Sequence, residues 1–223
     1  MGRPTLEIRD LCAGAIPAAF RSISFTVDRG EAVALLGGRG AGKSQLLRCI
    51  GLDLPPSSGS VLLGNIEVSG CTGDRRRQLR TRGIELVHPP APVHESDHRA
   101  PGAPTATVLP RRSPTVPVTG LRQRIQIARA ITQNVAVLLL DEPFAGVDLV
   151  VRDRIRELLL RARTEAGTAV VVATREPEVA RQLSDRLFVL HEGEIIESGS
   201  TGEVLHAPRD ARTRGLVHVR RSA

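Results

Sequence analysis

An eight-residue motif sets the strongest limit on what this chain can fold into. Residues 37–44 read Gly-Gly-Arg-Gly-Ala-Gly-Lys-Ser and match G-x-x-x-x-G-K-[ST] in full. The apolar run 31–37 before the motif reads as a buried strand, and a helix is expected to begin near Gly42 and end at Gly51. Glycines in such a turn let successive backbone N–H groups point at one place, where the helix N-terminus adds positive potential. The motif predicts a phosphate-binding loop in an α/β protein, and a glycine-rich connection without a ligand is the less specific alternative.

Lys43 is the only lysine of the chain, because arginine supplies the other 30 of its 31 basic Lys and Arg residues. A thin, flexible stem brings a compact charge to a phosphate, whereas a planar guanidinium is too bulky for the same cradle. We therefore expect Lys43 to contact phosphates and the Ser44 hydroxyl to reach Mg²⁺. The predicted nucleotide-binding residues are Gly37, Gly38, Arg39, Gly40, Ala41, Gly42, Lys43, Ser44 and Gln45.

A second motif lies about a hundred residues further on. The apolar run 135–140 ends in Asp141 and Glu142. In open parallel sheets, ligands bind at the carboxyl ends of the strands. Together with the glycine-rich loop, this predicts Asp141 as a Mg²⁺ ligand with Ser44, and Glu142 as the group that polarises an attacking water.

Strand-like and helix-like segments alternate along the chain. Strands are expected at 61–64, 84–88, 135–142, 168–174, 186–190 and 193–199, and helices at 73–83, 121–133, 150–167 and 176–185. In the helix 121–133, the residues Leu121, Ile125, Ile127, Ala128 and Ile131 are expected mostly on one face. The alternation predicts a mostly parallel sheet covered on both faces, in one domain over residues 1–223.

Residues 89–118 interrupt this pattern, since they hold eight of the fifteen prolines. Proline removes an amide donor and restricts the residue before it, so neither a long helix nor a regular strand is expected there. We interpret 89–118 as a flexible or extended insertion between residues 1–88 and 119–223.

Composition excludes several classes of protein. The formal charge is +7, but with no Trp or Tyr and only four Phe there is little aromatic surface for stacking bases, so no nucleic-acid partner is expected. Cys12, Cys49 and Cys71 are far apart and form no CxxC pair, which favours neither disulfides nor a metal site. No apolar run is long enough for a membrane span, and the N-terminus lacks the pattern of a signal peptide.

The two motifs, the stretch LRQRIQIARAI (121–131) and the order of the segments after them resemble the nucleotide-binding subunits of ABC transporters. The resemblance extends over nearly the whole chain apart from 89–118. Residues 138–148 look like the Walker B strand, the catalytic glutamate and the D-loop. Residues 73–87 and 207–217 are most similar to the dipeptide, oligopeptide and nickel importer branch.

The resemblance implies a P-loop α/β core, an N-terminal antiparallel β subdomain and a helical subdomain, shortened or disordered here because 89–118 occupies its place. It implies a cytoplasmic protein at the inner face of the cell membrane that binds ATP and Mg²⁺. A membrane-spanning permease and a second cassette, in a homodimer or heterodimer, would be its partners.

Four positions depart from the family pattern. The signature LSGGQ is replaced by residues 117–121, Pro-Val-Thr-Gly-Leu, in which only Gly120 matches. His88 occupies the position of the family's Mg²⁺-sensing glutamine, and Arg175 occupies the position of its switch histidine. Both remain candidate catalytic residues beside Glu142. Ala15 stands where an aromatic side chain would stack on adenine.

Three functions follow as hypotheses. The first is an ATPase subunit that drives transport of a substrate such as a peptide or nickel. The second is a degenerate cassette that binds ATP or a partner in a structural or regulatory role. The third, a non-transport cassette acting on nucleic acid or ribosomes, is supported only by the basic charge.

Overall fold

The computed structural model describes residues 4–13, 20–88 and 118–218. Their elements are β1 (Leu6–Ala13), β2 (Phe20–Val27), β3 (Ala32–Gly37), α1 (Lys43–Ile50), β4 (Ser58–Leu63), β5 (Ile66–Glu67), α2 (Gly73–Arg82), β6 (Ile84–Val87), α3 (Val118–Thr132), β7 (Val137–Asp141), α4 (Leu149–Arg161), the π-helix η1 (Ala162–Ala166), β8 (Ala169–Thr174), α5 (Pro177–Leu183), β9 (Arg186–His191), β10 (Glu194–Ser200), α6 (Thr201–His206) and α7 (Ala211–His218).

The strands form two sheets. The larger sheet has the order β10-β9-β3-β8-β7-β6, parallel throughout except for the antiparallel pairing of β10 with β9. The smaller sheet, β2-β1-β4-β5, is antiparallel. The predicted α/β class, with its mostly parallel sheet and N-terminal antiparallel subdomain, is confirmed.

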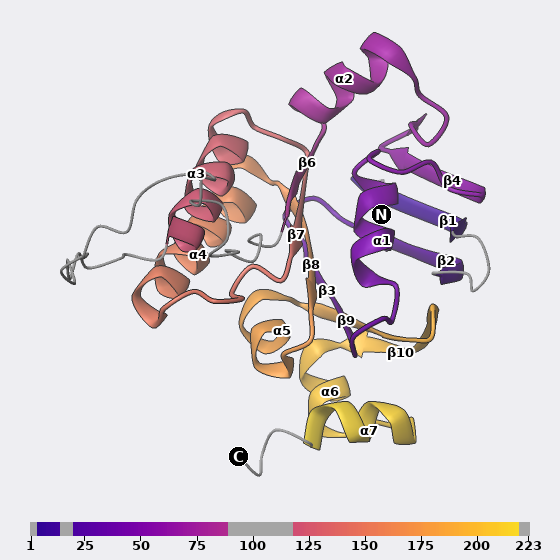
Figure 1. Ribbon diagram of the computed structural model, residues 1–223, viewed down its shortest axis with the longest axis vertical. Helices are drawn as coiled ribbons and strands as arrows, with labels where there is room; N and C mark the ends of the chain where they lie inside the picture. Colours follow the sequence, from indigo (N-terminus) through magenta and orange to yellow (C-terminus); the bar gives the residue numbers. More distant parts are fainter. Residues whose placement is uncertain (1–3, 14–19, 89–117, 219–223) are drawn as a thin grey trace, which may run out of the picture.

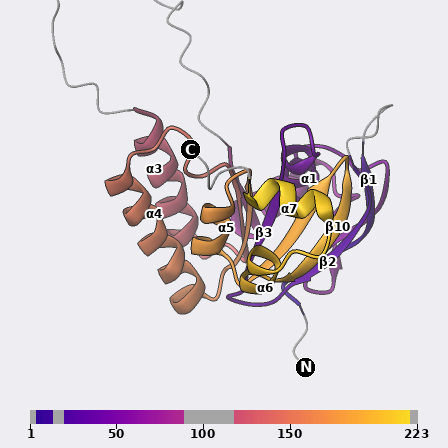
Figure 2. The same ribbon diagram turned by 90° about the horizontal axis from the view of Figure 1, so that it is seen from below.

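Both faces of the larger sheet are covered, which explains the unbroken apolar runs of its strands. In β7, Val137 and Leu139 face the core shared with α1 and the smaller sheet. Leu138 and Leu140 face the opposite core, to which α3, α4 and α5 contribute. Figure 1 shows α1 between the two sheets and α3 and α4 on the far side of the larger sheet, and Figure 2 shows the same layers from below.

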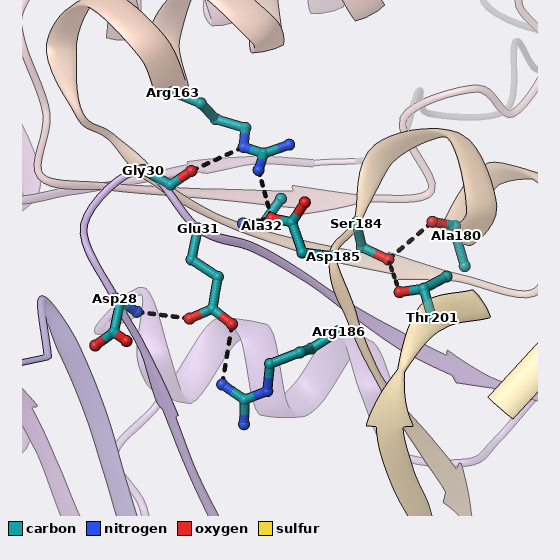
Figure 3. A network of polar contacts seen from close by, with 10 residues as sticks. All are labelled: Asp28, Gly30, Glu31, Ala32, Arg163, Ala180, Ser184, Asp185, Arg186 and Thr201. Atoms are coloured by element: carbon teal, nitrogen blue, oxygen red, sulfur yellow. Dashed lines mark hydrogen bonds and ion pairs between the residues drawn. The ribbon is translucent and has the colours of Figure 1, made fainter. Parts of the chain in front are cut away.

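The amino ends of the central strands are held by a polar network (Figure 3). The Asp185 carboxylate accepts a hydrogen bond from the Ala32 N–H at 2.9 Å and forms an ion pair with Arg163. Arg163 also donates to the Gly30 carbonyl at 2.9 Å, and Arg186 pairs with Glu31 at 3.0 Å. Because β3 and β9 are parallel, this network fixes the edge of the sheet opposite to their carboxyl ends and leaves the carboxyl edge for a site.

Some details differ from the sequence-based expectation. The helix α3 begins at Val118, a residue that the prediction gave to the insertion, and Ile125 is 58% exposed where the packed face was expected. Ile127 and Ala130 make the contact with the sheet, and Ile125 lies about 200° around the helix from Ile127. The expectation of an insertion concerns residues that, apart from Val118, lie outside the described part of the chain.

Two short helices, α6 and α7, were not predicted. Within the described residues, no helix is both long and apolar enough to pass through a membrane.

Candidate nucleotide-binding site

The glycine-rich loop joins the carboxyl end of β3 to α1. Gly40 and Gly42 have φ values of 81° and 93°, which glycine adopts without steric cost. A Cβ on Gly37 would come within 2.4 Å of the Leu190 carbonyl oxygen, so no other residue fits there. The loop thus reaches Lys43, the first residue of α1, in the wrapped conformation that the motif predicts.

Lys43 lies under this loop and is only 6% exposed. Its Nζ donates hydrogen bonds to the carbonyl oxygens of Gly37 at 2.8 Å and Gly38 at 2.9 Å. Burial lowers the pKa of Lys43, while the nearby carboxylates of Glu142 and Asp141 act in the opposite direction. The side chain is therefore held close to the loop, within the field of two acids.

Asp141 ends β7 and is 5% exposed. Burial raises the pKa of its carboxyl, and the hydroxyl of Ser44, a hydrogen-bond donor to it, acts to lower that pKa. Its Oδ1 is buried without a hydrogen-bond partner in the described structure. A buried carboxylate oxygen without a partner, beside a hydroxyl, fits a hard divalent cation that takes its remaining ligands from phosphate and water.

The metal site would depend on few protein ligands. Among the described residues, no group of three or more His, Cys, Asp and Glu side chains could hold a metal ion. Mg²⁺ is commonly bound by one or two protein oxygens together with substrate phosphates, so Ser44 and Asp141 suffice.

Glu142 and Arg175 come together from the ends of neighbouring strands. The Arg175 Nε donates to Oε1 of Glu142 at 2.9 Å. Glu142 has a φ of 46°, and its N–H donates to the Ala173 carbonyl at 2.9 Å. The two residues predicted from different segments thus form one ion pair beside Lys43 and Asp141.

His88, the third predicted catalytic residue, follows β6 and is exposed. Its Nε2 lies 3.4 Å from Oδ2 of Asp53, a carboxylate that also pairs with Arg80 at 2.8 Å. A positive charge on His88 would act to lower the pKa of the Asp141 carboxyl, after the larger effects of burial and of the Ser44 hydroxyl. Asp53 was not predicted, because nothing in its loop sequence, Leu-Asp-Leu-Pro, indicates a partner.

The outer side of the loop borders a cavity of about 410 Å³. Gly38, Arg39, Gly40 and Ala41 line it on the loop side, and His191 and Arg212 are among the residues opposite. Gln45 is exposed on the first turn of α1. Arg39 and Gln45 therefore lie at the surface of the site, whereas Lys43 is inside it.

The turn after Glu142 is fixed by Arg152, another residue that sequence reasoning missed. Its guanidinium donates to the carbonyl oxygens of Val147 at 3.0 Å and Phe144 at 3.1 Å. The Asp148 carboxylate caps α4 by accepting the Val151 N–H at 2.9 Å. The helix N-cap could have been predicted, because Asp148 directly precedes a helix. No sequence pattern indicates the contacts of Arg152 with the turn.

Of the signature positions, 118–120 lie in the first turn of α3, where only the backbone is described. Ala15 lies outside the described residues.

A glycine-rich loop after β3, a helix that begins at its lysine and an acid at the end of β7 define the class: a P-loop nucleotide-binding protein.

Comparison with known proteins identifies the family within this class. Residues 20–98 match the family described as ABC transporter. Across 97% of this chain and 98% of the relative, the chain is 32% identical to PhnK of Escherichia coli (strain K12), an ATP-binding protein named for phosphonates utilization.

It is also 32% identical to the methionine import ATP-binding protein MetN 2 of Rhodopseudomonas palustris, over 87% of this chain and 58% of that protein. A dimeric structure of the ATP-binding cassette MJ0796, bound to ADP and Pi, has the same fold, with a TM-score of 0.68 and 24% identity. That match covers 88% of this chain and 98% of the solved chain. The chain belongs to the ATP-binding subunits of ABC transporters.

Proposed function

We propose that the chain binds MgATP through Gly37–Ser44 and Asp141 and hydrolyses it, so that a separate membrane permease can move its substrate. The observation that carries this proposal is the convergence of Lys43, Asp141 and Glu142 at the carboxyl edge of one sheet. Lys43 would hold the terminal phosphates and Ser44 with Asp141 would hold Mg²⁺, which supplies positive charge to the phosphates. The Glu142 carboxylate would orient the attacking water.

The name of one of the relatives, MetN 2, supports an importer. PhnK is named for phosphonates utilization and MetN 2 for methionine import. A peptide or nickel substrate remains a prediction from the similarity of residues 73–87 and 207–217. We place the chain at the inner face of the cell membrane, against a permease, with a second cassette beside it.

The identity of that second cassette decides how many sites can work. In a homodimer, both sites would carry Val118 and Thr119 in place of the serine and first glycine of the signature. A heterodimer with an intact paralogue could form one complete site from this chain's Lys43 and the partner's signature. We therefore favour a heterodimer.

The second candidate function is a cassette that binds ATP without useful turnover. The observation that favours it is the engagement of both substituted residues in other contacts: Arg175 pairs with Glu142, and His88 with Asp53. In this case the chain would have a structural or regulatory role in a heterodimer.

Steady-state release of phosphate from MgATP, measured on the wild type, Lys43→Ala and Glu142→Gln, separates the two. Arg161→Gln, an exposed residue that pairs with Glu157 on α4, is the matched control. We expect turnover in the wild type and the control, loss of turnover in both site variants, and retained ATP binding in Glu142→Gln. ATP binding without turnover in the wild type would instead support the second candidate.

A further inference from the structure

The helix α2 carries a strong excess of positive charge. Its ten residues, GDRRRQLRTR, hold five arginines and one acid, Asp74. The helix α4 provides a contrast, because its arginines are balanced locally. Arg154, Arg156 and Arg161 each pair with an acid of the same helix, at 3.2, 3.2 and 2.8 Å. With one acid for five arginines, α2 cannot balance its charge in this way.

Two arginines of α2 have acidic partners. Arg80 pairs with Asp53 at 2.8 Å, and Arg77 lies 3.7 Å from Asp74. The Arg80 side chain is 47% exposed and that of Arg77 is 84% exposed. Exposed ion pairs stabilise a fold only slightly, so both guanidinium groups can turn to another anion at small cost.

Three further arginines border the same region. Arg75 and Arg76 of α2 and Arg129 of α3 form no ion pair with any residue that the structure describes. We define the basic patch as these three residues and the two paired arginines of α2: Arg75, Arg76, Arg77, Arg80 and Arg129. Four of the five line a cavity of about 370 Å³, in which Glu85 is the one acid among the lining residues. The patch therefore attracts anions.

The surface of α2 lacks the features that proteins and nucleic acids usually require. Leu79, its one large apolar residue, is partly buried against the core. The large apolar side chains that are exposed on the described residues all lie on other elements. The centre of a protein interface is apolar and poor in charge, and single-stranded nucleic acid needs aromatic side chains for stacking. The helix offers neither.

A layer of anionic headgroups needs only charge. Each arginine near an anionic membrane surface adds to the attraction, and the guanidinium fork can hold a phosphate through two hydrogen bonds. Figure 1 shows α2 at one end of the molecule, at the top, where a flat surface can approach it. The position and the charge of the patch therefore favour a membrane surface over the other anionic partners.

We propose that the basic patch binds the anionic phospholipid headgroups of the membrane. A headgroup phosphate enters the cavity between Arg76 and Arg129, and the other arginines of the patch contact neighbouring headgroups. The inference rests on the proposed function, which places the chain at the inner face of the cell membrane. It adds a direct contact with lipid to the proposed contact with a permease, and it turns the α2 end of the molecule toward the bilayer.

The test is sedimentation of the full chain with vesicles of phosphatidylcholine, alone or with about 30% phosphatidylglycerol. One triple variant removes charge from the patch, and a matched triple variant removes the same charge from α4. Glutamine is used throughout because its helix propensity is close to that of arginine. The variants are Arg75→Gln/Arg76→Gln/Arg129→Gln and Arg154→Gln/Arg156→Gln/Arg161→Gln.

The wild type should bind the anionic vesicles and not the neutral ones, and its binding should weaken as salt is added. The patch variant should lose at least about tenfold in its partition coefficient, and the α4 variant less than about threefold. Equal binding to both kinds of vesicle, or an equal loss in both variants, would overturn the proposal. So would release from the vesicles by millimolar inorganic phosphate at constant ionic strength, or complete release by duplex DNA at the same phosphate concentration.

MgATP titration of the same proteins separates this inference from the proposed function. Neither triple variant should change MgATP affinity by more than about twofold, since the substituted residues lie outside the nucleotide site. Loss of vesicle binding with normal MgATP binding would confine the role of the patch to the membrane. A wild type that binds vesicles but no MgATP would overturn the proposed function and not the lipid contact.

Discussion

Ser44 and Asp141 meet at the carboxyl edge of the larger sheet, one from the start of α1 and the other from the end of β7, with the Ser44 hydroxyl acting as a hydrogen-bond donor to the carboxylate. Their contact leaves Oδ1 of Asp141 buried without a partner in the described structure. A buried acid of this kind destabilises the empty chain and becomes favourable when a cation arrives.

Replacement of Asp141 by Asn should therefore stabilise the chain without nucleotide and abolish its stabilisation by MgATP. The expected rise in Tm is about 2–4 °C, which corresponds to about 1 kcal/mol for a chain of this length. Thermal denaturation with and without MgATP measures both effects. A lower Tm for Asp141→Asn in the empty state would contradict an unpaired buried charge.

The same residue gives the empty chain a pH dependence. Burial raises the pKa of Asp141 above its ordinary value of 3.8, so the folded chain keeps this proton to a higher pH than the unfolded chain does. This contribution to stability is present below the ordinary pKa and is lost as the pH rises through the folded value. Urea denaturation should show that the free energy of unfolding of the wild type, relative to that of Asp141→Asn, decreases between pH 4 and pH 7.

Arg152 should stabilise the turn between Glu142 and α4. Its guanidinium donates to two carbonyl oxygens and lies 5.5 Å from the Phe144 ring centroid. Arg152→Ala should lower the free energy of unfolding by about 1–3 kcal/mol, and Lys at this position should restore less than about half, because one ammonium group cannot replace the planar fork. Arg161→Ala on the same helix should cost less than about 0.5 kcal/mol in urea denaturation. Equal effects of the two alanine variants would show that the Arg152 contacts add nothing.

The cysteines should differ in reactivity. Burial raises the pKa of the Cys49 thiol to about 11, whereas the Ser22 N–H, which donates to the Cys12 sulfur at 3.2 Å, lowers the pKa of Cys12. Iodoacetamide should modify Cys12 at least about ten times faster than Cys49 in the native chain, and the two rates should converge in urea. Peptide mass mapping over time provides the rates. Fast native modification of Cys49 would mean that the core around α1 is not packed as described.

Restoring part of the signature should raise hydrolysis. In Val118→Ser/Thr119→Gly, a hydroxyl and a position without a side chain return where a partner's phosphate would approach in the proposed dimer. We expect a rise in kcat of about tenfold or more under conditions that favour dimers, with circular dichroism to check that α3 persists. An unchanged kcat would place the limiting defect at Arg175 or His88 instead.

The local parts of the site could be predicted from the sequence. Gly37–Ser44 is a continuous motif whose chemistry depends on its own backbone, and Asp141 is marked by the apolar strand that it ends. Parallel pairing of β7 with β8 then places Glu142 near Arg175, but a side-chain pair between separate segments leaves no periodic pattern in the sequence. The contacts of His88 with Asp53 and of Arg152 with the turn were missed for the same reason. The exposed position of Ile125 depends on which part of α3 packs on the sheet, and periodicity alone placed it on the wrong face.

The proposed function depends above all on the binding of ATP by Lys43 and its loop. Equilibrium titration of MgATP against the wild type, Lys43→Ala, Lys43→Arg and Arg161→Gln tests it most directly. We expect the wild type and Arg161→Gln to bind MgATP, and both Lys43 variants to lose at least about tenfold in affinity, since a guanidinium keeps the charge but does not fit beneath Gly37 and Gly38. No binding by the wild type, or equal binding by Lys43→Ala, would contradict it.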